Sequence, residues 1–348
     1  MIELRTPRGL RVQVPEHSAE DPSPRFGIDE AAALKQYYSD NGYAIVKGLV
    51  DPAACEQLRS LWAAEVKPSD AFIYRQATAK AERHRFNAQG WVMNPILNLQ
   101  SVDPRRYPQF RSFATARILT APGLIRAFRA LLGEQPKIVQ SMYFEGNSAT
   151  WEHQDSYYLD SERVGSMAAA WIAMQDIAAT AGRFFVCPKS HLIDLGRQTF
   201  QNNIADHHED YIQSVVQKVR ELDLPIRAPC LSQGDVLFWN AWTIHGSLDS
   251  QNTQFARASV TCHAIAESHR FLQLQTRLMP LQITRVNDVN IHCPKDLTQA
   301  RNRAIFHFET RYPGAFYYSK RTAIRWMMRL KRGTAAAANS LQPAPGRS

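Results

Sequence analysis

Several features that would place this chain in a specialised class of proteins are scarce or missing. Its 348 residues include only five cysteines (55, 187, 230, 262 and 293), and these form no Cys-x-x-Cys pair. The sequence therefore indicates neither a zinc ribbon nor a disulfide framework. No apolar run is long enough to cross a bilayer, and residues 1–7 hold no apolar signal-peptide core. We expect a cytoplasmic protein in a reducing compartment.

Internal repeats and low-complexity stretches are also missing from the body of the chain. Apolar residues make up 45% and charged residues 21% of the sequence, as in ordinary globular proteins. A chain of this length and composition can bury a large core without disulfides or structural metals. We therefore expect a folded globular protein.

Positive charge is also distributed unevenly along the sequence. The formal net charge is +9, but residues 320–332 alone hold six basic side chains and no acidic one. The net positive charge thus comes mainly from the C-terminal segment, and we do not expect the protein to bind nucleic acid. Residues 319–348 are interpreted as a basic, amphipathic segment followed by a disordered tail. Two readings stay open for it: a solvated tail, or peripheral contact with an anionic membrane or a carrier-bound substrate.

The local patterns predict an order of elements. Residues 1–27, with four prolines, are predicted to be an extended arm, and residues 28–318 one domain. A helix is expected from Asp29 to the stop at Asn41-Gly42, a strand over 43–46, and a second helix capped by Asp51-Pro52. Short β-rich runs then predict a sandwich or barrel; they cover 138–144, 168–174, 184–187, 236–239 and 257–264. A helical insertion is expected at about 189–233, in the position of a lid.

One short motif carries metal chemistry. His153 and Asp155 are two residues apart, so on a strand both side chains point to the same side. An imidazole and a carboxylate on one face suit Fe(II), and a second histidine would complete a facial triad with open positions. By itself, a His-x-Asp motif can equally be part of a surface turn.

The downstream sequence adds to this signal. The turn Gly234-Asp235 leads into an apolar strand, and His245 follows it. Twelve residues later, Arg257 begins a strand that alternates strictly between polar and apolar residues. The polar face of such a strand must look into water or a polar cavity. An arginine there can grip a carboxylate through two parallel hydrogen bonds.

These segments together resemble the phytanoyl-CoA dioxygenase family of Fe(II)/2-oxoglutarate oxygenases. The resemblance covers about residues 37–264 and rests on five stretches in the family's order: 37–49, 151–155, 171–176, 181–191 and 245–257. Two turns depart from the family pattern, at Ala181-Gly182 and at Pro188-Lys189-Ser190-His191, and neither removes a candidate ligand.

The resemblance implies a mainly β fold with flanking helices, the double-stranded β-helix (jelly roll, cupin-like). It implies Fe(II) held by His153, Asp155 and His245, with 2-oxoglutarate and O₂ as co-substrates. Arg257 would bind the distal carboxylate of 2-oxoglutarate. Ser259 would assist Arg257, and Gln140 is a weaker candidate beside the co-substrate or substrate.

The implied reaction is hydroxylation of an unactivated C–H bond in a small or lipid-like metabolite, with release of succinate and CO₂. In related halogenases a small residue replaces the carboxylate ligand, so the presence of Asp155 argues against halogenation. Desaturation, cyclisation and epimerisation remain open, and the sequence indicates no oligomeric state. The competing hypothesis is a catalytically silent relative that binds or regulates.

The remaining histidines and aromatic residues have two readings each. Tyr157, Tyr158 and Trp171 are candidate substrate contacts, although such residues are commonly core or barrel wall. His191 is interpreted as fixing a turn, with a metal-ligand role as its alternative, and His263 as lining the barrel. The run His207-His208-Glu209-Asp210 looks like a metal cluster, but a helix start is the better interpretation, because acidic residues favour helix N-termini.

Overall fold

The fold is that of a computed structural model, which describes residues 1–146, 149–193, 195, 207–275 and 277–323. The chain divides into two compact units, 1–297 and 298–348. In the second unit, α7 (Ala300–Arg311) is followed by helical residues from 313 to 323. The unit begins twenty-one residues before the predicted tail at 319, and most of the predicted amphipathic segment lies outside the described residues.

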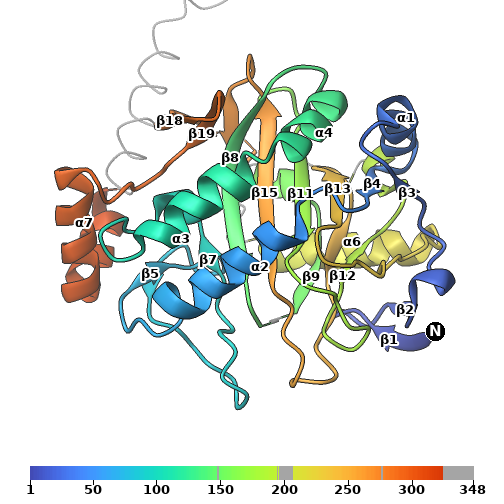
Figure 1. The fold of residues 1–348 in the computed structure, drawn as a ribbon, viewed down its shortest axis with the longest axis horizontal. Helices are drawn as coiled ribbons and strands as arrows, with labels where there is room; N and C mark the ends of the chain where they lie inside the picture. The colour runs from blue at the N-terminus through green and yellow to red at the C-terminus, as the bar shows by residue number, and fades with distance from the viewer. Residues whose placement is uncertain (147–148, 194, 196–206, 276, 324–348) are drawn as a thin grey trace, which may run out of the picture. The chain divides into compact units, whose positions relative to one another are not determined.

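A nine-stranded sheet forms the centre of the first unit (Figure 1). Its middle strands are antiparallel, whereas β19 pairs with β8, and β3 with β4, in parallel. In spatial order the strands are β18 (Ile283–Val286), β19 (Val289–His292), β8 (Pro136–Phe144), β15 (Ser259–Ala266), β11 (Ala168–Ala173), β13 (Val236–Asn240), β4 (Tyr43–Val46) and β3 (Arg25–Phe26), with β7 (Ile96–Leu97) also beside β8.

A smaller, three-stranded sheet closes the barrel. Its order is β12 (Phe184–Val186), β14 (His245–Ser247) and β9 (Thr150–His153). Phe184 and Val186 from this sheet pack with Tyr43, Trp171 and other residues of the large sheet in one interior cluster. Two sheets that share an interior in this way form a jelly roll, so the predicted double-stranded β-helix is confirmed.

Helices cover the outer face of the large sheet, because that face is apolar. Ala258, Val260, Cys262 and Ala264, the apolar positions predicted from the alternation, pack there against helical residues. Figure 1 shows these helices in front of the strands; they are α2 (Pro52–Leu61), α3 (Pro108–Phe113) and α4 (Pro122–Leu132), with the π-helical segments 62–66 and 114–119. The Asp51 carboxylate caps α2, as predicted, by accepting a hydrogen bond from Ala53 N at 2.9 Å.

Residues 1–27 contain more structure than an extended arm. β1 (Ile2–Arg5) and β2 (Arg11–Val14) form an antiparallel hairpin. Val12 and Val14 are buried against Phe185 of the small sheet, because the hairpin's alternation places both valines on one side. In the hairpin loop, the Thr6 hydroxyl donates to the buried carboxylate of Glu152. The arm is therefore attached beside the His-x-Asp motif.

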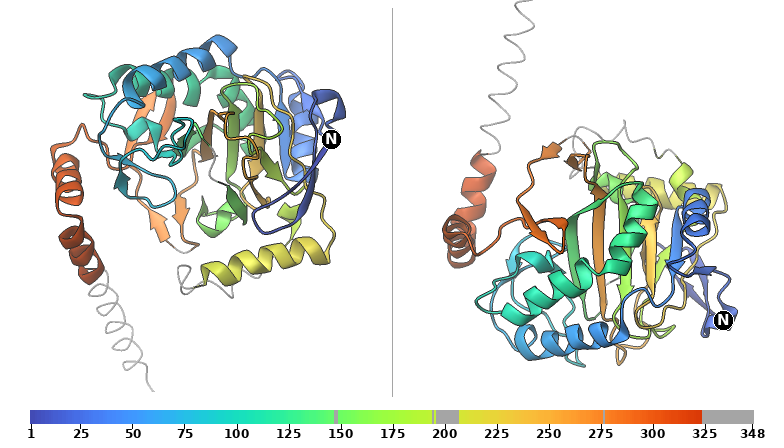
Figure 2. Two further views of the ribbon diagram at one scale, coloured as in Figure 1. Left: turned by 90° about the horizontal axis from the view of Figure 1, so that it is seen from below. Right: turned by 45° about the horizontal axis from the view of Figure 1, so that its top comes forward.

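The remaining described elements surround this frame. The predicted insertion helix is α6 (His208–Glu221), which packs beside β9, and Figure 2 shows it along one edge of the barrel. Three further strands pair as β10 (Leu159–Ser161), β16 (Phe271–Gln273) and β17 (Arg277–Met279), and two as β5 (Ile73–Tyr74) and β6 (Ala81–Glu82). Among the residues that the structure describes, no helix is both long and apolar enough to cross a membrane.

Gly42, at the end of α1 (Ala31–Asn41), is hydrogen-bonded to the segment that precedes His245. It ends the helix with φ +77°, and its carbonyl accepts hydrogen bonds from Asn240 N (2.8 Å) and the Thr243 hydroxyl (2.6 Å). A Cβ at this position would lie 2.4 Å from His191 Nδ1 and 2.5 Å from Thr243 Oγ1. Only glycine therefore fits here.

We expect Gly42→Ala to lower the free energy of unfolding by about 2 kcal/mol or more, because the left-handed conformation and the clash both add cost. Urea denaturation measures the change. The matched control is Gly133→Ala at the end of α4, where φ is also positive (+80°) but no atom lies within 4 Å. This control should lose only about 1 kcal/mol. Equal losses in the two variants would contradict the close approach at Gly42.

Candidate metal centre

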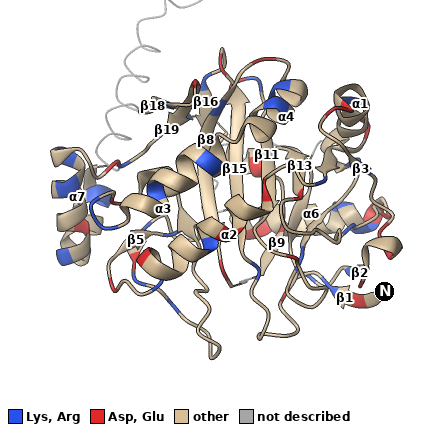
Figure 3. Ribbon diagram, in the orientation of Figure 1, with Lys and Arg blue, Asp and Glu red and all other residues tan. Residues whose placement is uncertain are grey.

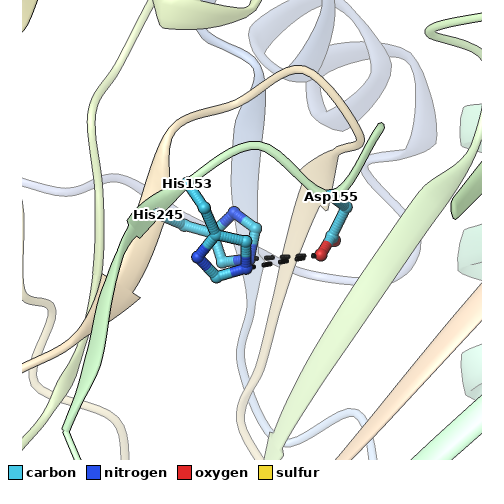
Figure 4. A group of neighbouring side chains, drawn as sticks. All are labelled: His153, Asp155 and His245. Carbon is cyan, nitrogen blue, oxygen red and sulfur yellow. Dashed lines mark ion pairs between the residues drawn. The ribbon is translucent and has the colours of Figure 1, made fainter. Parts of the chain in front are cut away.

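Three side chains from two neighbouring strands and a short turn point toward one another (Figure 4). His153 ends β9, Asp155 begins the 3-10 turn Asp155–Tyr157, and His245 begins β14. His153 and His245 are direct partners in the β9–β14 ladder, so the sheet itself places their rings side by side. One ligand atom from each of the three residues lies within 4.8 Å of the others.

The imidazoles are oriented for a metal. His153 Nδ1 lies 2.8 Å from the Trp151 carbonyl, and His245 Nδ1 lies 2.9 Å from the Thr243 carbonyl. A carbonyl accepts only from N–H, so each ring carries a proton on Nδ1 and directs its Nε2 toward Asp155. The two Nε2 atoms lie 3.7 Å and 3.5 Å from Asp155 Oδ1. Burial and the neighbouring His245 ring lower the pKa of His153, which keeps its imidazole neutral.

The two oxygens of Asp155 have different surroundings. Oδ2 accepts a 2.8 Å hydrogen bond from Trp239 Nε1 and lies 3.3 Å from His263 Nε2, whereas Oδ1 faces the two ligand rings. Burial opposes ionisation here, but the His245 and His263 imidazoles hold the pKa of the Asp155 carboxyl well below its usual range. The carboxylate is thus ionised and presents one oxygen to the centre.

Two imidazoles and one carboxylate on one side of a site are the facial set that suits Fe(II) and leaves positions open for other ligands. The described residues therefore fit a resident iron ion.

We expect Trp239→Phe to weaken metal binding by about 10-fold, because groups that orient a ligand typically account for 10–100-fold in affinity. The substitution removes the indole N–H that holds Asp155 Oδ2 and keeps an aromatic ring among the interior residues. Titration of the metal-free protein with Mn(II) measures the dissociation constant. An unchanged constant would show that Asp155 needs no donor on Oδ2.

Arg257 is a buried cation without an acidic partner among the described residues. Its side chain donates from Nη1 to the Gly182 carbonyl at 3.0 Å, while its buried Nε has no hydrogen-bond partner. The guanidinium lies 5.4 Å from the ring centroid of Phe144 and 5.9 Å from that of Trp171. Burial lowers its pKa to about 9. A charge so poorly compensated indicates a place for an anion.

The other co-substrate candidates share the inward face of the large sheet. Gln140 pairs directly with His263, and partners in an antiparallel ladder point to the same side. Ser259 is fully buried and bonds to the Arg257 carbonyl, which places it beside the arginine. Trp171 is also buried, with its ring toward Arg257. Ser259 and Trp171 thus lie beside Arg257, and Gln140 lies beside His263, which contacts Asp155.

The two tyrosines after Asp155 separate. Tyr157 is 2% exposed and stacks on Tyr211 of α6, with ring centroids 3.7 Å apart and an interplanar angle of 8°, so it packs in the core. Tyr158 is partly exposed; its ring lies 5.7 Å from that of His153, and its hydroxyl contacts His208 Nε2 at 2.7 Å. Tyr158 is therefore the tyrosine that borders the metal centre.

Other histidines take the alternative roles. His191 Nε2 contacts the Ser39 carbonyl at 2.9 Å and so fixes a turn. The run from His207 to Asp210 begins α6, as the helix-start interpretation has it. His263 lines the barrel but also reaches Asp155, which its six-residue separation from Arg257 did not suggest. Trp239 was likewise missed as a partner of Asp155, because an indole in an apolar strand has the pattern of a core residue.

The sequence model of the phytanoyl-CoA dioxygenase (PhyH) family matches residues 38–258. The chain belongs to this family. Enzymes of this family use Fe(II) as their metal and 2-oxoglutarate and O₂ as co-substrates. Two relatives are peroxisomal phytanoyl-CoA dioxygenases: one from Bos taurus (22% identical, covering 66% of each chain) and one from Homo sapiens (23% identical, covering 68% of each chain). The chain thus spans about two-thirds of the length of these relatives.

Solved structures of the family's fold are similar to this one. The 2-oxoglutarate-dependent carbocyclase SnoK from nogalamycin biosynthesis has a TM-score of 0.51 at 15% identity, over 73% of this chain and 90% of its own. The epimerase SnoN from the same biosynthesis has a TM-score of 0.50 at 17% identity, over 76% and 99%. EctD from S. alaskensis, solved with 2-oxoglutarate and 5-hydroxyectoine, has a TM-score of 0.50 at 15% identity, over 80% and 94%. At these identities the likeness supports the fold.

Proposed function

We propose that this protein is an active Fe(II)/2-oxoglutarate-dependent dioxygenase that hydroxylates an unactivated C–H bond of a small or lipid-like metabolite. The observation that carries the proposal is the pairing of a complete candidate metal triad with Arg257, a buried arginine in the same barrel whose Nε has no hydrogen-bond partner among the described residues. When bound, iron with 2-oxoglutarate and O₂ supplies the oxidising chemistry, with release of succinate and CO₂. The protein contributes geometry, charge and exclusion of water.

Each residue has a defined part in this proposal. His153, His245 and Asp155 Oδ1 hold the metal, and Arg257 binds the distal carboxylate of 2-oxoglutarate through its unpaired Nε edge. Ser259 supports the arginine.

The remaining interior positions meet the co-substrate or the substrate. Gln140 lines the co-substrate region. Trp171, beside Arg257, and Tyr158, near His153, contact the substrate. Asp155 keeps its coordination position occupied, which favours hydroxylation over halogenation.

Charge distribution supports a small-molecule substrate over a nucleic acid. Figure 3 shows basic and acidic residues dispersed over helices and loops, with the strands of the large sheet largely uncharged. A nucleic-acid groove would need basic and aromatic residues interleaved along one surface. We also propose that the protein is cytoplasmic, as predicted from its sequence.

Succinate release tests the proposal. The full chain, with Fe(II), ascorbate, O₂ and 2-oxoglutarate, should form succinate slowly on its own and faster with members of a panel of candidate metabolites. Metal and 2-oxoglutarate binding without succinate formation, across the panel and in its absence, would overturn it and favour the silent binding protein.

A further inference from the structure

Gln154, the residue between the two ligands of the His-x-Asp motif, is held from both sides. It follows the last residue of β9, so its backbone groups lie beyond the β9–β14 ladder. Its side chain donates to the Trp242 carbonyl, on the loop that leads to His245. Its backbone is held by a residue of a different element, Tyr211 of α6.

A single hydroxyl makes this second attachment. Gln154 N–H donates to the Tyr211 hydroxyl at 2.8 Å, and the same hydroxyl donates to the Gln154 carbonyl at 3.2 Å. Both groups are buried, so neither could turn to water if the hydroxyl were removed. One oxygen therefore fixes the peptide groups on both sides of the residue that separates His153 from Asp155.

The tyrosine is itself held firmly. Its ring stacks on Tyr157, which is only two residues beyond Asp155. Around it, the buried face of α6 packs into one apolar cluster, formed by Ile212, Val215, Val216 and Val219. At the start of the helix, His208 contacts the Tyr158 hydroxyl, and Glu209 forms a 2.7 Å ion pair with Arg8. Helix α6 is thus fixed against the metal-binding segment by several independent contacts.

We propose that Tyr211 is a positioning residue for the metal centre: its hydroxyl sets the spacing and direction of His153 and Asp155 through the backbone of Gln154. Without it, the motif keeps the β9 ladder at His153 but loses a restraint immediately before Asp155. The ligand set then fits a metal less well, although every ligand is still present. This inference rests on the proposed function, since it assigns a role at the same site.

Cobalt binding tests the inference without requiring turnover. Full-length wild type and Tyr211→Phe are titrated with Co(II) alone, and the visible absorption bands of the bound metal report the ligand geometry. Phenylalanine keeps the ring that stacks on Tyr157 and removes only the hydroxyl. We expect the Co(II) dissociation constant to rise about 10-fold, as for other groups that orient ligands, with altered band intensities.

The control is Val215→Ala on the same helix. Val215 is fully buried in the α6 cluster, so this variant loosens the packing and leaves the bonds to Gln154 in place. Thermal unfolding of the metal-free proteins shows how much stability each variant loses. We expect Val215→Ala to bind Co(II) like wild type even where its melting temperature falls.

Two results would overturn the inference. One is a Tyr211→Phe protein with wild-type affinity and spectrum; the other is an equal loss of affinity in Val215→Ala, which would make the effect one of helix packing. Failure of the wild-type protein to bind Co(II) would instead contradict the proposed function, and the inference with it. The wild-type titration therefore distinguishes the two failures.

Discussion

Replacing Arg257 with methionine should strongly weaken 2-oxoglutarate binding without destabilising the protein in the absence of 2-oxoglutarate. The guanidinium is buried; Nη1 donates to the Gly182 carbonyl, and Nε has no partner in the part of the chain that the structure describes. Removing a charge so poorly compensated relieves a desolvation cost, and methionine fills much of the space. Loss of one partner of a buried charge pair typically costs about 2–5 kcal/mol of binding, so we expect affinity to fall by about 30-fold or more.

Calorimetry with Mn(II) in place of iron measures the 2-oxoglutarate affinity, and thermal unfolding with and without 2-oxoglutarate measures the stabilisation. Wild type should gain about 2.7 kcal/mol at a concentration 100 times its dissociation constant, and Arg257→Met should gain about 0.9 kcal/mol or less at the same concentration. Undiminished 2-oxoglutarate binding by Arg257→Met would show that the anion binds elsewhere.

Arg183→Met provides the matched control. Arg183 is also buried, but it donates to the Pro15 carbonyl through Nη1 and to the Ile177 carbonyl through Nε and Nη2. Its removal leaves carbonyls unpaired, so the free energy of unfolding should fall by about 1–3 kcal/mol, while 2-oxoglutarate affinity stays unchanged. Two buried arginines should therefore give opposite results in the two measurements.

Removal of the second imidazole by His245→Ala should eliminate metal-dependent turnover. His245 provides one of three protein ligands, and its Nε2 lies 3.5 Å from Asp155 Oδ1. We expect the Mn(II) dissociation constant to rise at least about 100-fold, because loss of a group that only orients a metal ligand already costs up to about 100-fold in affinity. Succinate formation should fall below detection. Full 2-oxoglutarate consumption by this variant would contradict the assigned triad.

A histidine outside the triad serves as the control for that variant. His191 contacts the Ser39 carbonyl, and its place before the second imidazole in the sequence also allows a ligand role. His191→Gln should keep metal affinity and succinate formation at wild-type levels. A loss of metal binding in this variant would require a different ligand set.

Most of the frame could be predicted because its signals are local. The stop at Asn41-Gly42, the cap at Asp51-Pro52 and the alternation after Arg257 each depend on neighbouring residues, and the structure contains all three features. The arm at 1–27 was harder to predict, since four prolines suggest an open chain. Burial of Val12 and Val14 depends on Phe185, more than 170 residues away, which no local pattern reveals.

The site shows the same division. His153 and Asp155 are recognisable by their spacing, and Arg257 by its place on an alternating strand. Trp239, His263 and Tyr211 could not be identified from the sequence as partners of the metal-binding segment. Their contacts to Asp155 and Gln154 arise only when distant strands and a helix meet. An indole in an apolar strand and a tyrosine in an amphipathic helix have the sequence pattern of ordinary core residues.

The β1–β2 hairpin has a practical consequence for anyone shortening this protein. Its loop supplies the Thr6 hydroxyl to Glu152, a carboxylate with no exposed surface that directly precedes His153. A version starting at residue 28 would keep every candidate ligand and yet leave that acid without its donor, next to the candidate metal centre. Deleting the hairpin is therefore a change to the surroundings of the proposed iron site, even though the family match begins only at residue 38.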